Sequence, residues 1–275
     1  MIKRGRSLLK KSTILFIGAG RMAESILSGL VQSPNVKDIY VSNHRNKEKL
    51  IYLQKKYQII PSLNWREDIE KADMVVLAMP PEVHLSLLQD MKPFIHHHFV
   101  VTIAAGIGPS FLEEHLPENT PAAWVIPNTA SEIGQSMSLV SYGKAVLDNH
   151  KSMLKQVLDA IGEAEECTEE QVHQLTAITG SAPAFLYAFS ESLIEQAESY
   201  GVSHETAVRL VSQMMAGSSS MLKAKLAPKE LREQVTTPGG ATAEGMKVLQ
   251  EGGFDDLIKK AVIATNKKAM GKWQE

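Results

Sequence analysis

A glycine-rich turn near the start of the chain has the residue types that bind phosphate through backbone amides. The run Gly18-Ala-Gly-Arg-Met-Ala23 follows the apolar segment 13–17 and precedes a segment of helical periodicity, 22–31. Its first glycine permits a tight turn, its second lets a pyrophosphate approach the backbone, and the small Ala23 lets helix and strand pack closely. Free N–H groups at the helix start then bind the phosphates. The pattern predicts a dinucleotide site; a packing turn with no ligand is the alternative.

The segment after the second predicted strand indicates which dinucleotide binds. At this distance from the glycine turn, NAD-binding proteins usually carry an acid that binds the ribose 2′-hydroxyl. Residues 42–47 read Ser-Asn-His-Arg-Asn-Lys and contain no acid, whereas Arg45 can bind a 2′-phosphate with two parallel hydrogen bonds. NADP(H) is therefore favoured over NAD(H), with use of both left open. A solvated helix start is the alternative interpretation.

A second glycine-rich segment, Thr237-Pro-Gly-Gly-Ala-Thr242, precedes a predicted helix that begins near Ala243. Pro238 stiffens the chain, and the two glycines permit conformations closed to other residues, so successive N–H groups can converge on an anion. The helix N-terminus adds a favourable potential, and the bounding threonines supply hydroxyls. The segment predicts a site for a small anion. An ordinary turn and helix cap is the alternative.

Composition excludes several other classes of function. The 275 residues carry a formal net charge of −2, which provides no basic field for nucleic acid or an anionic membrane. A lone cysteine, Cys167, excludes an internal disulfide and a cysteine-rich metal cluster. The three consecutive histidines 96–98 cannot all face one ion on regular structure, so no metal site is predicted. With no long apolar run and a basic tail, 1–12, without a signal-peptide core, we expect a cytoplasmic protein.

Two regions of different pattern must position these residues. Up to about Cys167, short β-branched runs alternate with helical stretches, which predicts a parallel Rossmann-type α/β sheet with helices on both faces. Beyond Cys167 all segments read as helical, so we expect two domains, 1–168 and 169–275. The predicted strands are 13–17, 38–41, 59–60, 74–78, 99–103, 122–125 and 138–141, and the predicted helices are 22–31, 47–57, 65–72, 82–91, 151–161, 169–176, 183–200, 203–222, 228–235, 243–250 and 254–272.

Two helices of the second region carry surfaces suited to a partner. The helix 183–200 has a broad apolar face, and 203–222 combines small residues with Met214, Met215 and Met221. Small residues let helices approach closely, and methionines adapt to irregular surfaces. Dimer interface and intrachain core are both open on this pattern alone. The lysines of 47–56 are expected on a solvated helix face.

Two longer motifs in the second half resemble a known enzyme family. Thr176-Ala-Ile-Thr-Gly-Ser-Ala-Pro-Ala-Phe185 and Val235-Thr-Thr-Pro-Gly-Gly-Ala-Thr242 resemble the two signatures of pyrroline-5-carboxylate reductase. The glycine turn, Ala104-Ala-Gly106 and Pro127-Asn-Thr129 extend the resemblance over nearly the whole chain. It implies a Rossmann domain followed by an all-α dimerisation domain, with active sites between the subunits of a homodimer or a ring of dimers. The implied activity is NAD(P)H-dependent reduction of 1-pyrroline-5-carboxylate to L-proline, the last step of proline biosynthesis.

The resemblance also assigns residues to the site. Thr242, with adjacent amides, is expected to bind the substrate carboxylate and to lie near the imine nitrogen, directly or through a water, as the catalytic residue. Glu169 is expected near the substrate, a solvated helix-start carboxylate being the alternative. The remaining substrate residues are Thr237, Gly239, Gly240 and Ala241, and the cofactor residues are Ile17, Gly18, Ala19, Gly20, Arg21, Met22, Ser42, Asn43, Asn64, Ala78, Met79, Pro80, Pro81, Ala104, Ala105 and Gly106, together with Arg45.

Three departures from the family pattern keep alternatives open. Pro80 stands where the family has a lysine, Trp124 where it has an arginine, and Ala182 and Phe185 replace a glycine and a tyrosine. The first two remove cations near the cofactor, so a cofactor-binding regulatory paralogue without turnover remains an alternative, as does another NADP-dependent reductase of cyclic imines. A β-hydroxyacid dehydrogenase would need a lysine on the first long C-terminal helix, and 180–222 contains none.

Overall fold

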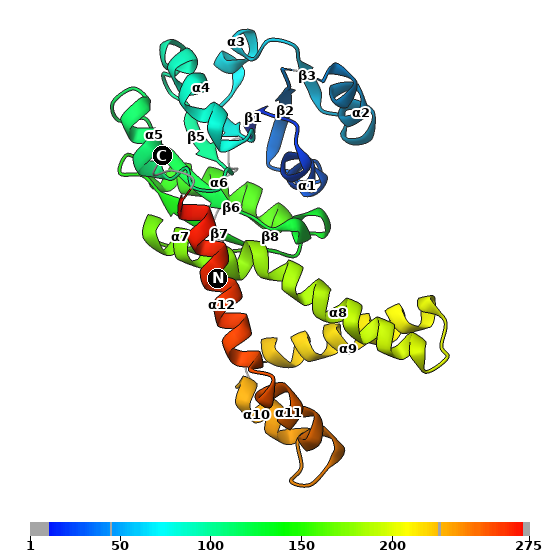
Figure 1. Cartoon of the computed structure of the whole chain (residues 1–275). Coiled ribbons are helices and arrows are strands. Elements are labelled where there is room, and N and C mark those ends of the chain that lie inside the picture. Colours follow the sequence, from blue (N-terminus) through cyan, green and yellow to red (C-terminus); the bar gives the residue numbers. More distant parts are fainter. Residues whose placement is uncertain (1–10, 45, 225–226, 272–275) are drawn as a thin grey trace, which may run out of the picture. The chain divides into compact units, whose positions relative to one another are not determined.

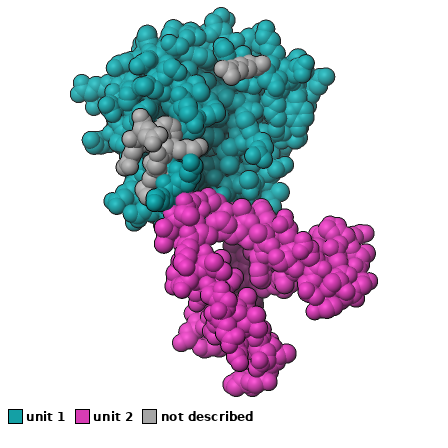
Figure 2. All heavy atoms as spheres, in the orientation of Figure 1, with its two compact units in different colours: residues 1–180, 266–275 teal, residues 181–265 magenta. Residues whose placement is uncertain are grey.

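The computed structural model describes residues 11–44, 46–224 and 227–271, so Arg45 and most of the predicted basic tail lie outside the described residues. The chain forms two compact units, one of residues 1–180 with 266–275 and one of residues 181–265 (Figure 2). We call them unit 1 and unit 2. The compact units divide at Gly180 rather than at the change of pattern near residue 168.

Unit 1 is built on an eight-stranded sheet of order β3-β2-β1-β4-β5-β6-β7-β8 (Figure 1). Neighbouring strands run parallel except β6 and β7, which are antiparallel, so the predicted Rossmann-type sheet is confirmed. The strands are β1 (Ser12–Ile17), β2 (Val36–Ser42), β3 (Ile60–Ser62), β4 (Met74–Leu77), β5 (Phe99–Thr102), β6 (Ala122–Ile126), β7 (Ser136–Tyr142) and β8 (Gly162–Glu166).

Helices cover both faces of this sheet. Those on one face are α1 (Arg21–Leu30), α2 (Lys47–Tyr57) and α6 (Asp148–Ile161), and those on the other are α3 (Trp65–Asp68), α4 (His84–Met91) and α5 (Pro109–His115). In β1, Ile14 and Phe16 pack in the core on the face covered by α1, α2 and α6, while Leu15 and Ile17 pack in the core on the opposite face. Because both faces are buried, the strand reads as apolar throughout rather than as an alternating pattern.

One strand and one α-helix of unit 1, β8 and α5, escape the sequence prediction. β8 contains three glutamates and little that is apolar, because it lies at the edge of the sheet and its side chains are largely exposed. Charged side chains on an edge strand oppose unwanted pairing with another sheet. α5 is only seven residues long, with a proline at its first position, and gives too short a periodic signal.

α7 (Glu169–Thr176) belongs to unit 1 although it begins the predicted helical region. Its buried Val172 packs against Trp124, Ile126 and Leu139 of β6 and β7, and Cys167 packs beside them as a small apolar residue. The chain returns to the same helix after unit 2, where Asn266 Nδ2 donates to the carbonyl of Gln174 at 2.7 Å.

Unit 2 consists of helices, as predicted. They are α8 (Ala182–Ser199), α9 (His204–Lys223), α10 (Pro228–Gln234), α11 (Ala241–Glu251) and most of α12 (Phe254–Gly271). Pro183 and Pro228 occupy first turns, and Ser203 accepts a hydrogen bond from the Thr206 amide, so these predicted helix starts are confirmed. Within the described part of the chain, no helix has the length and apolar character needed to cross a membrane.

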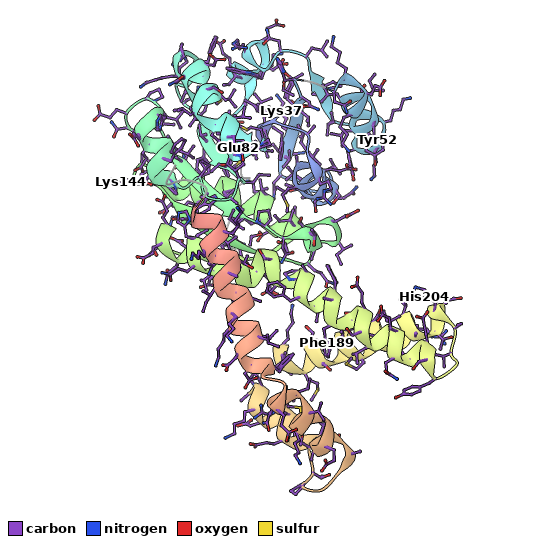
Figure 3. The ribbon with its side chains drawn as sticks, viewed as in Figure 1. Lys37, Tyr52, Glu82, Lys144, Phe189 and His204 are labelled. Carbon is purple, nitrogen blue, oxygen red and sulfur yellow. The ribbon has the colours of Figure 1, made fainter. Side chains whose placement is uncertain are left out.

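Unit 2 has almost no core of its own. Among its described residues only Ala207 and Val211, both on α9, are buried. Large apolar side chains on α8 and α9 are instead exposed, including Phe189 (Figure 3), Leu186, Leu210 and Met214. The predicted apolar surfaces of these helices therefore do not form an intrachain core in this unit.

Candidate functional site

Five parallel strands bring the predicted cofactor residues to one edge of the sheet. The register pairs Ile17 at the end of β1 with Ser42 and with Leu77, and Leu77 with Thr102. The segments that follow these paired strand ends therefore begin side by side. The segments concerned are 18–22, 42–43, 64, 78–81 and 104–106. They flank the point between β1 and β4 where strand order reverses, which is where open α/β sheets bind their ligands.

The first glycine of the turn is required by its surroundings. Gly18 has φ +109°, and a Cβ there would lie 2.5 Å from the carbonyl oxygen of Ala78. Its amide donates to the carbonyl of Ser42 at 2.8 Å, and the amide of Ala78 donates to the carbonyl of Ile17 at 2.8 Å. These contacts fix the turn between the neighbouring strand ends.

The start of α1 fits an anion. Gly20 is the residue before the helix, and no side chain caps it there. The first amides of a helix have no intrahelical partner, so those after Gly20 are available to a phosphate together with the helix dipole. Gly20 and Arg21 are both exposed, which keeps this end of the helix open. The residues present therefore fit the pyrophosphate of a dinucleotide.

Polar residues follow β2 and β3 at the same edge. Asn43 Nδ2 donates to the carbonyl of Asn46 at 3.4 Å, and Asn46 Oδ1 caps α2 by accepting from the Lys49 amide at 2.8 Å. Asn64 caps α3 in the same way through the Arg66 amide. Asn43 and Asn46 thus lie between the end of β2 and the start of α2, and the sequence has no acid between Ser42 and Lys47.

A carboxylate that the sequence analysis missed joins α1 to α2. Glu24 accepts hydrogen bonds from Lys49 and Lys56 and from Tyr52, which is labelled in Figure 3. Burial on its own raises the pKa of Glu24, but the hydrogen bonds from these three residues outweigh it and lower the pKa to about 2. The prediction that the lysines of α2 lie on a solvated face is confirmed for Lys47, Lys55 and Lys56, which are exposed, and is wrong for Lys49, which is half-buried. No local pattern signals this contact, because its partners are 25 or more residues apart.

Trp124 supports the loop after β5. It is 1% exposed, its Nε1 donates to the carbonyl of Ala104 at 2.8 Å, and its ring lies 4.6 Å from that of His173 on α7. Where the resemblance leads one to expect an arginine, this chain therefore has a buried indole that holds the backbone of a predicted cofactor segment. The sequence alone shows that the arginine of the family is replaced, but it does not show the contact between Trp124 and Ala104.

The Pro-Asn-Thr motif and the first signature meet in unit 1. Asn128 Oδ1 accepts from the amide of Ala130 at 3.0 Å, and its Nδ2 donates to the carbonyl of Thr179 at 3.0 Å. Thr179 lies in a single π-helical turn, Ala177–Ser181, between α7 and α8. Such single π-helical turns inside helices are frequent at functional sites. Two motifs some 50 residues apart are therefore one structural feature.

Glu169 has a structural contact in unit 1. Its carboxylate accepts from the Ser110 hydroxyl at 2.6 Å and from the Ser110 amide at 3.1 Å, at the start of α5. It also fills the space beside Gly108, where a Cβ would collide with it. The carboxylate complements the dipole of α5. Its substrate role stays a prediction.

The late glycine segment lies in unit 2 and forms a tight turn. The amide of Gly240 donates to the carbonyl of Thr237 at 3.0 Å, with Pro238 and Gly239 at the corner and Gly239 at φ +74°, the geometry of a type II turn. α11 begins at Ala241, two residues earlier than predicted, because Gly240 already acts as its N-cap. Thr242 is thus the second residue of the helix. The first two amides, of Ala241 and Thr242, point out of an exposed helix start.

Comparison with known proteins gives a consistent result. Residues 169–271 match the pyrroline-5-carboxylate reductase dimerisation family, and residues 13–106 match the family described as NADP oxidoreductase, coenzyme F420-dependent. Pyrroline-5-carboxylate reductase 2 of Bacillus subtilis (strain 168) is 32% identical over 257 residues, 92% of each chain. Pyrroline-5-carboxylate reductase 1 of the same strain is 32% identical over 274 residues, 97% of this chain and 92% of that one.

Solved structures agree with these relatives. Plasmodium falciparum pyrroline carboxylate reductase with NADP bound has a TM-score of 0.87 and 26% identity, covering 96% of this chain and 98% of that one. A pyrroline-5-carboxylate reductase from Coxiella burnetii has a TM-score of 0.84 and 29% identity, covering 94% and 98%. On the identity and coverage of these relatives, the chain belongs to the pyrroline-5-carboxylate reductase family.

Proposed function

We propose that this protein reduces 1-pyrroline-5-carboxylate to L-proline with NADPH, the last step of proline biosynthesis. The observation that carries the proposal is the turn at Thr237–Thr242, which sets exposed helix amides and a threonine hydroxyl together in a chain that also has a dinucleotide turn at Gly18. One feature suits a small carboxylate and the other a pyrophosphate. A cyclic imino acid and a nicotinamide dinucleotide need that pair of anion sites.

Unit 1 supplies the cofactor site in this proposal. The amides at the start of α1 bind the pyrophosphate, and the segments 78–81 and 104–106 line the remainder of the cofactor. The bound nicotinamide supplies a hydride. Since Gly18 lies directly on the carbonyl of Ala78, the turn and the segment after β4 form one surface for the dinucleotide.

Unit 2 supplies the substrate site. The amides of Ala241 and Thr242 and the Thr242 hydroxyl bind the substrate carboxylate, while Gly239, with open space beside it, leaves room for the ring. Reduction places hydride on the imine carbon, and the ring nitrogen keeps the proton that makes the imine electrophilic. A threonine hydroxyl is a weak acid, so this proton comes from solvent. Thr242 then acts by holding the substrate in position.

The cofactor preference rests on the residues after β2. With no acid between Ser42 and Lys47, nothing there repels a 2′-phosphate, and Asn43 and His44 offer hydrogen-bond donors. Glu24, the nearby acid on α1, is already engaged with Lys49 and Lys56. The predicted bidentate contact of Arg45 lies outside the described residues. We propose NADP(H) over NAD(H), to be tested by the ratio of kcat/KM for NADPH and NADH.

A homodimer, or a ring of dimers, completes the active site. The match to a dimerisation family covers unit 2, where apolar side chains such as Phe189 and Leu210 are exposed in the single chain. Burial of these side chains against a second copy is favourable. In this proposal the substrate turn of one subunit meets a cofactor site within the assembled dimer.

The direct test follows NADPH absorbance in the presence of 1-pyrroline-5-carboxylate, with proline identified as the product. We expect turnover that requires both the imine and its carboxylate, so 1-pyrroline, which lacks the carboxylate, should be a much poorer substrate. NADPH binding without turnover would instead identify a regulatory paralogue, the alternative raised by Pro80 and Trp124. Oxidation of a β-hydroxyacid would contradict the proposal outright.

A further inference from the structure

A buried histidine lies between the two loops that follow β4 and β5. His84, the first residue of α4, is 0% exposed. Its Nδ1 lies 3.2 Å from the carbonyl oxygen of Pro80, and its Nε2 lies 2.9 Å from the hydroxyl of Thr102, which is also 0% exposed. The imidazole therefore bridges the segment after β4 and the last residue of β5.

The hydrogen bonds continue into the second loop. The Thr102 hydroxyl oxygen accepts from the amide of Ala104 at 3.2 Å, and the carbonyl of Ala104 accepts from Trp124 Nε1 at 2.8 Å. One chain of contacts thus runs from Pro80 through the imidazole and the hydroxyl to both sides of Ala104. Pro80 and Ala104 are members of the two segments assigned to the cofactor.

The groups at the two ends fix the direction of the outer bonds, and the neutral form of His84 fixes that of the bond between Nε2 and Thr102. The carbonyl of Pro80 can only accept, so His84 Nδ1 must carry a proton. The amide of Ala104 can only donate, so the Thr102 oxygen accepts from it and its own proton is free to point at Nε2. A neutral imidazole protonated on Nδ1 satisfies both contacts. Burial, the largest influence, lowers the pKa of His84 and favours the same neutral form.

Two consecutive prolines explain why the first loop needs such a support. Neither Pro80 nor Pro81 has an amide proton, so this stretch cannot anchor itself to its neighbours as a donor. Its carbonyl at Pro80 accepts instead, from the amide of Val83 at 3.1 Å and from His84. The His84 side chain therefore fixes the backbone at Pro80 and Pro81, which has no N–H group to donate.

We propose that His84 and Thr102 are positioning residues for the dinucleotide, because they lock the Pro80 and Ala104 segments in one relative arrangement. The inference rests on the proposed function for the identity of the cofactor. The inference does not depend on turnover, since the Pro80 and Ala104 segments belong to the proposed cofactor-binding surface. Pre-organised backbone lowers the cost of binding, so loss of the lock weakens cofactor affinity more than it slows the chemical step.

A matched pair of histidines provides the test. His98 is also 0% exposed, and its Nε2 lies 3.0 Å from the carbonyl of Ile69, but it precedes β5 at the opposite edge of the sheet. NADPH affinity is measured without substrate, by quenching of protein fluorescence, for His84→Phe and for His98→Phe. We expect the first change to raise the Kd for NADPH about tenfold and the second to leave it unchanged. Equal effects of the two changes would overturn the proposal.

A second pair covers the case in which His84→Phe does not fold. Thr102→Ser keeps the hydroxyl, whereas Thr102→Val removes it at nearly constant volume. We expect the serine variant to bind NADPH like the wild type and the valine variant to bind it several-fold more weakly. Equal affinities of the two variants would contradict a positioning role for Thr102.

The tautomer gives a readout free of cofactor and substrate. Nitrogen-15 spectra of the wild-type protein should show His84 neutral and protonated on Nδ1 at neutral pH. A proton on Nε2 alone would overturn the assignment, as would a wild-type protein that binds no NADP(H). A wild type that binds NADPH but does not reduce the imine would contradict only the proposed function, and the comparisons of variants would still decide the inference.

Discussion

Unit 1 and unit 2 are stabilised in opposite ways. Unit 1 has two cores, one on each face of its sheet, with strands such as β1 and β4 buried along their whole length. Unit 2 has long helices, yet only Ala207 and Val211 among its described residues are buried. Helices in proteins owe most of their stability to packing of an apolar face. Unit 1 contains that packing, whereas unit 2 leaves apolar side chains of α8 and α9 exposed and matches a dimerisation family.

The division matches the two parts of the proposed site. The cofactor segments lie on strand ends that unit 1 fixes by itself, and the substrate turn lies in the unit that depends on assembly. Changes in unit 1 should therefore act through the stability of the fold or the affinity for the dinucleotide. Changes in unit 2 should act through association or substrate binding.

The largest effect is expected from the core of unit 1. Phe16 is 0% exposed, and Phe16→Ala should lower the free energy of unfolding by about 3–5 kcal/mol, measured by urea denaturation at fixed protein concentration. Ile51→Ala on α2, where the side chain is 51% exposed, is the control and should cost less than about 0.5 kcal/mol. A similar cost for both would contradict the described core.

A charge on the exposed apolar surface of unit 2 should break assembly. Phe189→Glu is expected to weaken the dimer at least about a hundredfold, because association would bury an unpaired carboxylate. Sedimentation at several concentrations measures this, and activity should fall with the dimer. Glu195→Lys, at an exposed polar position on the same helix, should leave assembly intact. An unchanged dimer in Phe189→Glu would place the interface elsewhere.

Loss of the Thr242 hydroxyl should reduce catalysis without changing the stability of the fold. Thr242→Ala is expected to lower kcat/KM for the imine by about 1.5–3 kcal/mol of transition-state stabilisation, roughly tenfold to a hundredfold. Thr236→Ala is the matched control, since the Thr236 hydroxyl donates to the carbonyl of Arg232 within unit 2. Unchanged kcat/KM in Thr242→Ala would exclude it from the site.

The smallest effect concerns acid stability in unit 1. The pKa of Glu24 is lowered from its ordinary value of 4.5 to about 2. Its contribution to the free energy of unfolding is therefore complete above pH 4.5 and is lost as the pH falls toward 2. Glu24→Gln should therefore lower the free energy of unfolding by about 1 kcal/mol at neutral pH. Between pH 4.5 and 2, this free energy should then depend less on pH than in the wild type. Glu48→Gln, an exposed acid on α2, should retain the wild-type curve. Parallel curves for wild type and Glu24→Gln would contradict the role of Glu24.

The sequence predicts those elements whose signals are local. The glycine turn, the apolar strands and the proline and serine helix starts all depend on a few adjacent residues, and each of these predicted elements is present. β8 was missed because an edge strand of glutamates lacks the apolar pattern of a buried strand. The start of α11 was misplaced because glycine is a weaker N-cap signal than serine.

Contacts between distant segments account for the rest of the site. Glu24 meets lysines of the next helix, and His84 meets Thr102 across neighbouring strand ends. Trp124 was noted only as a missing cation, although its indole holds the carbonyl of Ala104. Such pairings depend on strand order and register, which a single sequence does not specify residue by residue.

The return of the chain to α7 has a practical consequence for protein engineering. Because Asn266 meets the carbonyl of Gln174, unit 2 leaves and rejoins unit 1 near one helix, as an inserted domain does. A short flexible linker from Gly180 to Asn266 could therefore excise Ser181–Thr265 and isolate the sheet domain as a stand-alone dinucleotide sensor.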